Sequence, residues 1–141
     1  MKTFTGSCHC GAVRSEITSD FPELTTCDCS ICRRKNALMV KVHESQFKLL
    51  SGGDLLNMYQ FHTFTAKHYF CSVCGIYTHH KRRSNPNELG VNVACLVGMS
   101  PFDFREVKVH DGERHPADNA EHKTYAAGVL RFEPASRLSI S

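Results

Sequence analysis

The 141-residue sequence has no tryptophan, little excess charge and no long apolar run. Its 17 Lys and Arg residues against 14 Asp and Glu give a net charge of only +3, which does not demand a polyanionic partner. No run approaches the roughly 18 to 20 apolar residues that a membrane-spanning helix requires. Hydrophobic residues make up 41% of the chain, as in ordinary globular proteins, so a disordered chain is excluded.

The N-terminal residues lack both the apolar core and the small-residue cleavage site of a signal peptide. We therefore expect a cytoplasmic protein with no membrane partner. The sequence also lacks internal repeats, low-complexity tracts and linkers. A single domain over residues 1–141 is expected, with its core within 3–112. The segment 116–141 either adds one strand at 128–132 or stays partly loose.

What the sequence has in abundance is cysteine, with eight residues. Disulfides are rare in a reducing cytosol, where grouped cysteines more often bind metal or do chemistry. Seven of the eight form tight groups, which are Cys8/Cys10, Cys27/Cys29/Cys32 and Cys71/Cys74. A disulfide across one intervening residue is strained, so this spacing favours metal binding over a disulfide framework.

Two of the groups have the same form, a cysteine pair in a predicted tight turn followed by glycine. They read Cys8-His9-Cys10-Gly11 and Cys71-Ser72-Val73-Cys74-Gly75. Glycine permits the backbone conformation that points amide N–H groups at the sulfur atoms. Four thiolates fill the tetrahedral shell of Zn²⁺, so Cys8, Cys10, Cys71 and Cys74 are predicted to hold a structural zinc. The alternative is that they are ordinary cysteines at turns.

The third group, Cys27, Cys29 and Cys32, offers three thiolates. Three protein ligands with one free position are typical of a catalytic zinc. A thiolate-rich centre is a weak Lewis acid towards water and suits another sulfur ligand. The group therefore predicts chemistry on a substrate thiol or its adduct, because the metal would deprotonate that thiol. The alternative is a second structural site completed by Cys95 or a histidine.

Other residues near these groups carry weaker signals. The cations at 33–35 would compensate the negative charge of the site or bind a substrate carboxylate, unless they form a solvated basic edge. Cys95 is interpreted as a small buried hydrophobe, or as a ligand or redox group near the three cysteines. The histidines at 62, 68, 79 and 80 are expected at the surface, and the aromatic stretch 59–70 in the core or a pocket wall. No general base is identified.

Alternation of apolar and polar residues predicts a mainly β protein of two packed sheets. Strands are expected over 2–5, 12–18, 38–43, 47–50, 55–61, 76–80, 89–94 and 106–110, with turn signals between them. A single short helix is expected over 30–35, with Asp28 or Ser30 as its N-cap.

Read together, the motifs resemble one family. They are C-x-C-G at 8–11, C-x-C-S-x-C-R at 27–33, F-C-x-x-C-G at 70–75 and N-x-x-C-L at 92–96. This order is similar to that of the glutathione-dependent formaldehyde-activating enzyme and centromere protein V family, over about residues 3–112. The resemblance implies an Mss4-like complex β-fold, with two packed antiparallel sheets, zinc-binding turns and little helix. It also implies two Zn²⁺ per chain, held by the same two cysteine sets, with the catalytic ion readily lost.

The resemblance further implies an activity, the condensation of formaldehyde with glutathione to S-(hydroxymethyl)glutathione. We therefore predict a zinc-dependent carbon–sulfur lyase or synthase of this type, with Cys27, Cys29 and Cys32 at its catalytic centre. Glutathione or a similar small thiol and an aldehyde are its expected partners. The alternative is a non-catalytic zinc module that binds protein or nucleic acid, although the short basic clusters at 33–35 and 81–83 make no nucleic-acid footprint. A protein-folding or exchange partner is suggested by fold analogy alone.

Overall fold

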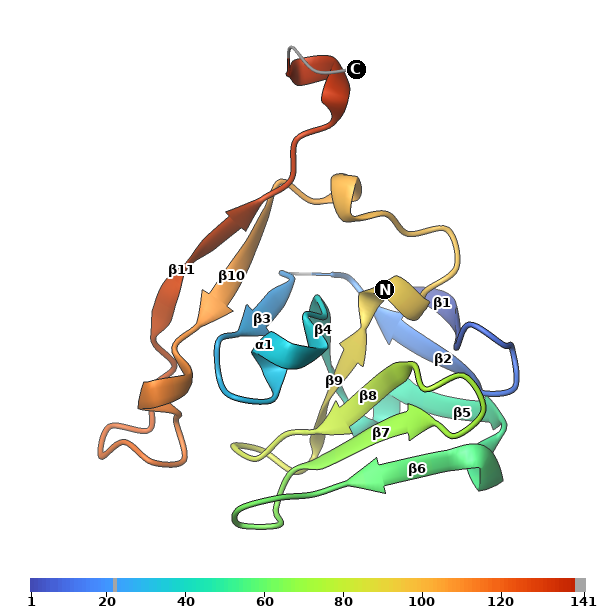
Figure 1. The fold of residues 1–141 in the computed structure, drawn as a ribbon, viewed down its shortest axis with the longest axis horizontal. Coiled ribbons are helices and arrows are strands. Elements are labelled where there is room, and N and C mark those ends of the chain that lie inside the picture. Colours follow the sequence, from blue (N-terminus) through green and yellow to red (C-terminus); the bar gives the residue numbers. More distant parts are fainter. Residues whose placement is uncertain (22, 139–141) are drawn as a thin grey trace.

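The computed structural model describes residues 1–21 and 23–138, and this part of the chain forms two β-sheets (Figure 1). The smaller sheet has three strands in the order β1-β2-β5, which are β1 (Lys2–Ser7), β2 (Arg14–Ser19) and β5 (Phe47–Ser51). The larger has eight in the order β11-β10-β3-β4-β9-β8-β7-β6. Its strands are β3 (Thr25–Cys27), β4 (Met39–His43), β6 (Leu56–Tyr59), β7 (Lys67–Cys71), β8 (Tyr77–Lys81), β9 (Glu88–Asn92), β10 (Glu106–His110) and β11 (Ala126–Arg131).

Helix is confined to short pieces in the described residues. The α-helix α1 spans Cys32–Lys35, a single turn. The 3₁₀ turns are η1 (Glu44–Gln46), η2 (Gly53–Leu55), η3 (Val93–Cys95), η4 (Pro101–Asp103), η5 (Gly112–Arg114) and η6 (Ala135–Arg137). Across 1–21 and 23–138, no helix has the length and apolar character to cross a membrane. The expected mainly β architecture with two sheets and little helix is confirmed.

Most expected strands are present with shifted ends, but three expectations were wrong. The strands β3 and β7 were not predicted, because β3 is only three residues long and Lys67–Cys71 lacks a clean alternation. Residues 93–94, expected in a strand, begin the 3₁₀ turn η3 instead. The pairing is antiparallel throughout the two sheets except between β10 and β3, which run parallel.

The main core lies between the sheets. Ile17 of β2 is fully buried, and it belongs to one cluster with Val40 and Val42 of β4, Val91 of β9 and Val107 of β10. Burying a side chain of this size stabilises a fold by about 1.5 to 3 kcal/mol. The alternation of β4 and β9 therefore fixes which face of the larger sheet meets the smaller one.

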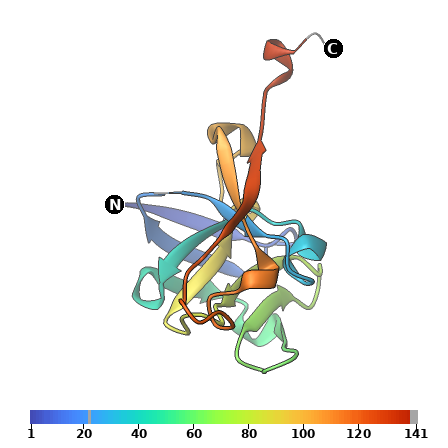
Figure 2. The same ribbon diagram turned by 90° about the vertical axis from the view of Figure 1, so that its left-hand side faces the viewer.

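The strand β11 forms the edge of the larger sheet and pairs antiparallel with β10 (Figure 2). The strand expected at 128–132 is thus present, but it starts two residues earlier and ends one residue earlier. All six residues of β11 are exposed, so hydrogen bonding to β10, rather than a buried face, holds it. The chain continues past β11 to η6 (Ala135–Arg137), which stands away from the sheets (Figure 1).

Candidate metal centres and the adjoining cleft

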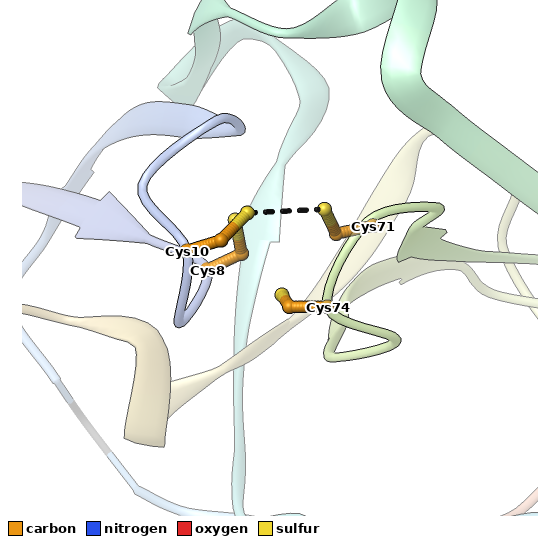
Figure 3. A group of neighbouring side chains, drawn as sticks. All are labelled: Cys8, Cys10, Cys71 and Cys74. Carbon is orange, nitrogen blue, oxygen red and sulfur yellow. Dashed lines mark hydrogen bonds between the residues drawn. The ribbon is translucent and has the colours of Figure 1, made fainter.

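Four cysteines from two distant turns converge on one point (Figure 3). The sulfur atoms of Cys8, Cys10, Cys71 and Cys74 all lie within 4.8 Å of one another. The Sγ–Sγ distance is 3.6 Å between Cys8 and Cys10 and 3.7 Å between Cys10 and Cys71. Four sulfur atoms placed about 2.3 Å from a central zinc stand about 3.8 Å apart, so this group could hold Zn²⁺.

In both turns a backbone N–H donates to the first thiol, from five residues further along the chain in one turn and from two residues further in the other. The N–H of Val13 donates to Sγ of Cys8 over 3.3 Å, and the N–H of Val73 donates to Sγ of Cys71 over 3.4 Å. Gly11 and Gly75 close the turns with φ angles of 81° and 77°, a region that favours glycine. Amide donors stabilise the thiolate form, and the N–H of Cys10 is the main reason that the pKa of Cys74 falls to about 6.

The four-cysteine group joins the two sheets. Cys8 and Cys10 lie in the turn between β1 and β2 of the smaller sheet, whereas Cys71 ends β7 of the larger sheet. Cys8 and Cys71 are buried in a second apolar cluster with Val13, against which Leu55 and Leu56 pack. A metal held here would have four protein ligands, with apolar side chains around Cys8 and Cys71, while Cys10 is exposed.

The second group lies on one loop. Sγ atoms of Cys27, Cys29 and Cys32 also lie within 4.8 Å of one another, so this group too could hold a metal ion. Cys27 ends β3 and Cys32 begins α1. The N–H of Cys29 donates to Sγ of Cys27, and the N–H of Cys32 donates to Sγ of Cys29, each over 3.4 Å. Hydrogen bonds from the thiols of Cys27 and Cys32 strongly lower the pKa of Cys29.

This loop is tied to the segment after β10. The N–H of Asp28 donates to the carbonyl of His110 over 3.1 Å, and the N–H of Gly112 donates to the Asp28 carboxylate over 2.6 Å. A Cβ atom on Gly112 would lie 2.5 Å from Cα of Cys29, so only glycine fits there. The expected helix capping by Asp28 or Ser30 was wrong. The N-cap position is Ile31, whose apolar side chain cannot make a capping bond, and the Asp28 carboxylate accepts from Gly112 instead.

The three-cysteine group opens onto a cleft of about 960 Å³ on the larger sheet. The cleft is lined by Cys27, Cys29 and Cys32, by His68 of β7 and His80 of β8, and by parts of β10 and of the loops at 61–66 and 111–116. No residue of the four-cysteine group lines this cleft. Small-molecule sites typically enclose about 300 to 1,000 Å³, so the cleft has room for a peptide-sized thiol.

Two comparisons with known proteins agree with this geometry. The family model described as "Glutathione-dependent formaldehyde-activating enzyme" matches residues 3–108, which include both cysteine groups. The chain belongs to this family. A solved structure of a Rhodobacter sphaeroides protein shares 50% sequence identity and superposes with a TM-score of 0.72, covering 74% of this chain and 98% of that one. The resemblance seen in the motifs is thereby confirmed.

In this family member, several histidines lie where the sequence did not place them. His68 and His79 are buried and His80 is half-buried, so the expected surface positions were wrong for these three, whereas His62 is exposed as expected. His68 and His80 pair across β7 and β8, and their rings stack with centroids 5.2 Å apart. Burial, with the charge of Lys35 second, lowers the pKa of His68 to about 4, and burial lowers the pKa of His80 well below its ordinary value. Both rings are therefore uncharged at neutral pH.

Lys35 and Tyr77 contact these two rings at their Nδ1 atoms. Nζ of Lys35 lies 3.1 Å from Nδ1 of His68 and 3.7 Å above the centroid of the Tyr77 ring. The hydroxyl of Tyr77 lies 2.5 Å from Nδ1 of His80. Gly90 of β9 leaves room for this arrangement, because a Cβ atom there would collide with the His80 ring.

A β-bulge places Tyr77 and His80 on the same side of β8. Residues three apart in a regular strand point to opposite faces. Here Tyr69 pairs with His79 and Phe70 pairs with Tyr77, which leaves Thr78 as an extra, unpaired residue. Bulges of this kind redirect side chains and are common beside functional sites. The sequence carries no turn residue that signals this bulge.

The remaining candidate residues have less central positions. Arg33 lines the cleft and Arg34 is exposed, with its Nη1 donating to the carbonyl of Ser30, whereas Lys35 turns inward to His68. Cys95 is half-buried in η3, with Sγ 3.6 Å from the carbonyl of Tyr77, and it belongs to neither cysteine group. Phe61 stacks on His68 at 5.9 Å and lines the cleft, as expected for a pocket wall. Tyr59 and Phe64 of the same stretch are exposed, so the expectation was wrong for them.

Proposed function

We propose that this chain is a carbon–sulfur lyase or synthase of the S-(hydroxymethyl)glutathione synthase type, which joins a small thiol to an aldehyde. The observation that carries the proposal is that all three residues of the three-cysteine group line a large cleft, whereas no residue of the four-cysteine group does. Glutathione and formaldehyde are the reactants suggested by the family description.

The two groups take different roles in this proposal. Cys8, Cys10, Cys71 and Cys74 hold a structural zinc, since four thiolates leave no position for a substrate. Cys27, Cys29 and Cys32 hold the catalytic zinc, which when bound lowers the pKa of a thiol that takes its fourth position. The three cysteines fix that position at the cleft wall, where Arg33 also lies and can attract a substrate carboxylate.

The charge distribution of the cleft argues against the alternative of a nucleic-acid module. Arg82 is paired with Glu88 at 2.7 Å, Arg83 forms a two-pronged pair with Asp118, and Lys108 lies 3.3 Å from Glu23. These cations are compensated by carboxylates rather than forming a stripe that could follow a phosphate backbone. The paired charges are better suited to binding a small zwitterionic molecule than to binding a nucleic acid.

The test combines two measurements. Exchange spectroscopy measures the rate at which glutathione and formaldehyde form the adduct, and zinc analysis measures the number of zinc ions per chain. The wild-type chain is expected to carry two zinc ions and to accelerate formation of the adduct over the uncatalysed reaction. Cys29→Ser should retain one zinc and the fold, and lose activity on the order of 100-fold or more, because a ligand rather than an outer partner is removed. Cys95→Ser is the matched control, since this cysteine lies outside both groups, and it should keep both zinc ions.

Two results would contradict the proposal. A wild-type chain with both zinc ions and no acceleration would exclude this reaction and favour a binding role. Unfolding of Cys29→Ser, with Cys95→Ser remaining folded, would show that the three-cysteine group is structural rather than open to substrate.

A further inference from the structure

The His68/His80 pair, defined as the two stacked rings across β7 and β8, faces the same cleft as the three-cysteine group. The Nδ1 atom of each ring already has a hydrogen-bond partner, which is Lys35 for His68 and Tyr77 for His80. Among the described residues, neither Nε2 atom has a hydrogen-bond partner, and no buried side-chain nitrogen or oxygen is left unpaired. The two Nε2 atoms are therefore not fully buried, and both residues line the cleft.

The partners at Nδ1 decide which ring nitrogen carries the hydrogen. Lys35 stands over the Tyr77 ring in cation–π geometry, which favours its ammonium form even though burial lowers its pKa, and an ammonium group can only donate. Nδ1 of His68 must then accept, so the hydrogen of the uncharged ring is on Nε2.

The same reasoning applies to His80. Burial raises the pKa of Tyr77 well above its ordinary value, so its hydroxyl keeps its proton. That hydroxyl lies 2.5 Å from Nδ1 of His80 but 3.3 Å from the carbonyl of Gly90, and the shorter contact takes the hydrogen. His80 is thereby also left with its hydrogen on Nε2.

We propose that the His68/His80 pair presents two Nε2–H donors to the cleft and that these bind the aldehyde oxygen during addition of the thiol. This step rests on the proposed function. The sulfur–carbon bond forms while the π electrons of the carbonyl move to its oxygen, where the negative charge develops. The proton released by the thiol then returns to that oxygen through solvent in the cleft, so the addition leaves the net charge unchanged.

In its chemistry, the His68/His80 pair is similar to an oxyanion hole, in which fixed N–H donors stabilise the negative charge that develops on an oxygen atom. Removal of one such donor typically slows a reaction by 10² to 10³-fold. Lys35 and Tyr77 act as positioning residues, because they touch the rings and set the tautomers without lining the cleft.

The first measurement needs no variant and no activity. Long-range ¹H–¹⁵N correlation of the ¹⁵N-labelled, zinc-loaded wild type at pH 7 reports the tautomer of each ring. The hydrogen is expected on Nε2 of both His68 and His80. A hydrogen on Nδ1 of either ring, or a doubly protonated ring, would contradict the proposal that both rings present an Nε2–H donor. In Lys35→Met the signal of His68 should move towards a mixture of tautomers, while that of His80 stays unchanged.

The second measurement tests the aldehyde oxygen as the ligand. His68→Phe and His80→Phe should each lower kcat/KM for formaldehyde about 100-fold, with the zinc content and the KM for glutathione unchanged. His68→Gln, which keeps a side-chain N–H donor, should recover part of the loss. His79→Phe is the matched control, because His79 is buried beside His80 but does not line the cleft.

The outcomes separate the two proposals. A folded, zinc-loaded His68→Phe variant that keeps the wild-type rate would overturn the role of the pair while leaving the proposed function intact. If the wild type itself does not accelerate the reaction, the proposed function fails and the aldehyde as ligand fails with it. The tautomer measurement then decides by itself whether the donor pair exists.

Discussion

The two cysteine groups differ in how far apart in the chain their members lie. Cys10 and Cys71, 61 positions apart, come from turns of two different sheets, whereas the three-cysteine group lies within residues 27–32 of one loop. A metal that joins distant segments offsets the entropy of closing a long loop, and its binding free energy then contributes to folding. A local group closes only a short loop. We therefore expect the fold to depend on the first group much more than on the second.

The side chains that surround the two cysteine groups also differ. The four-cysteine group is backed by Val13, Leu55 and Leu56, which offer nothing to a polar ligand. The three-cysteine group faces a cleft that also contains His68 and His80. Apolar neighbours offer no group that could bind a reactant, whereas polar neighbours can bind and orient one. The comparison teaches that ligand number and neighbouring side chains together distinguish the two groups.

The largest expected effect comes from breaking the four-cysteine group. Cys71→Ser should abolish cooperative unfolding, because structural zinc contributes about 10 to 16 kcal/mol in small zinc domains, which is comparable to the whole stability of a domain. Thermal unfolding followed by circular dichroism, with zinc analysis, measures this. Cys95→Ser should unfold like the wild type. A Cys71→Ser variant that melts within a few degrees of the wild type would remove the distinction between the groups.

Acid should release the two metals in separate steps. Protons compete with zinc for thiolates, so both sites lose metal as the pH falls. The three-cysteine group, with one fewer protein ligand and an open position, should release its zinc at the higher pH, without unfolding. The four-cysteine group should release zinc at lower pH, together with unfolding. A zinc-sensitive dye and circular dichroism across a pH series measure both steps, and a single step with simultaneous unfolding would contradict the comparison.

The smallest expected effect concerns the wall of the cleft. The Arg83 guanidinium holds Asp118 and lowers the pKa of that carboxyl, and it thereby fixes the loop around 115–118. Exposed ion pairs contribute about 0 to 1 kcal/mol. Asp118→Asn should therefore lower stability only slightly, and raise the KM for glutathione a few-fold.

Both zinc ions should remain bound in that variant, as judged by zinc analysis. Glu121→Gln, in the same loop but away from the cleft, is the control and should leave KM unchanged. Loss of one zinc from Asp118→Asn would mean that the loop supports the metal itself and not only the substrate.

Much of the candidate site could be predicted because its signals are local. Pairs such as Cys8 and Cys10 are brought together by the turn they share, so their spacing predicts their sulfur geometry without knowledge of the rest of the fold. The strands with clean alternation, such as β4 around Val40 and Val42, were predicted for the same reason. The three-residue strand β3 could not be predicted, because its place is set by its neighbours β10 and β4.

The sequence by itself determined the two thiol groups, their division into four and three, and the mainly β class. Only the tertiary structure decided what surrounds them. His68 meets His80 because of the register between β7 and β8, and Tyr77 reaches His80 because of the bulge at Thr78. Gly112 lies under Cys29 because β10 pairs with β3. Register and bulges depend on packing energies summed over the whole chain, whereas a turn depends only on its own few residues.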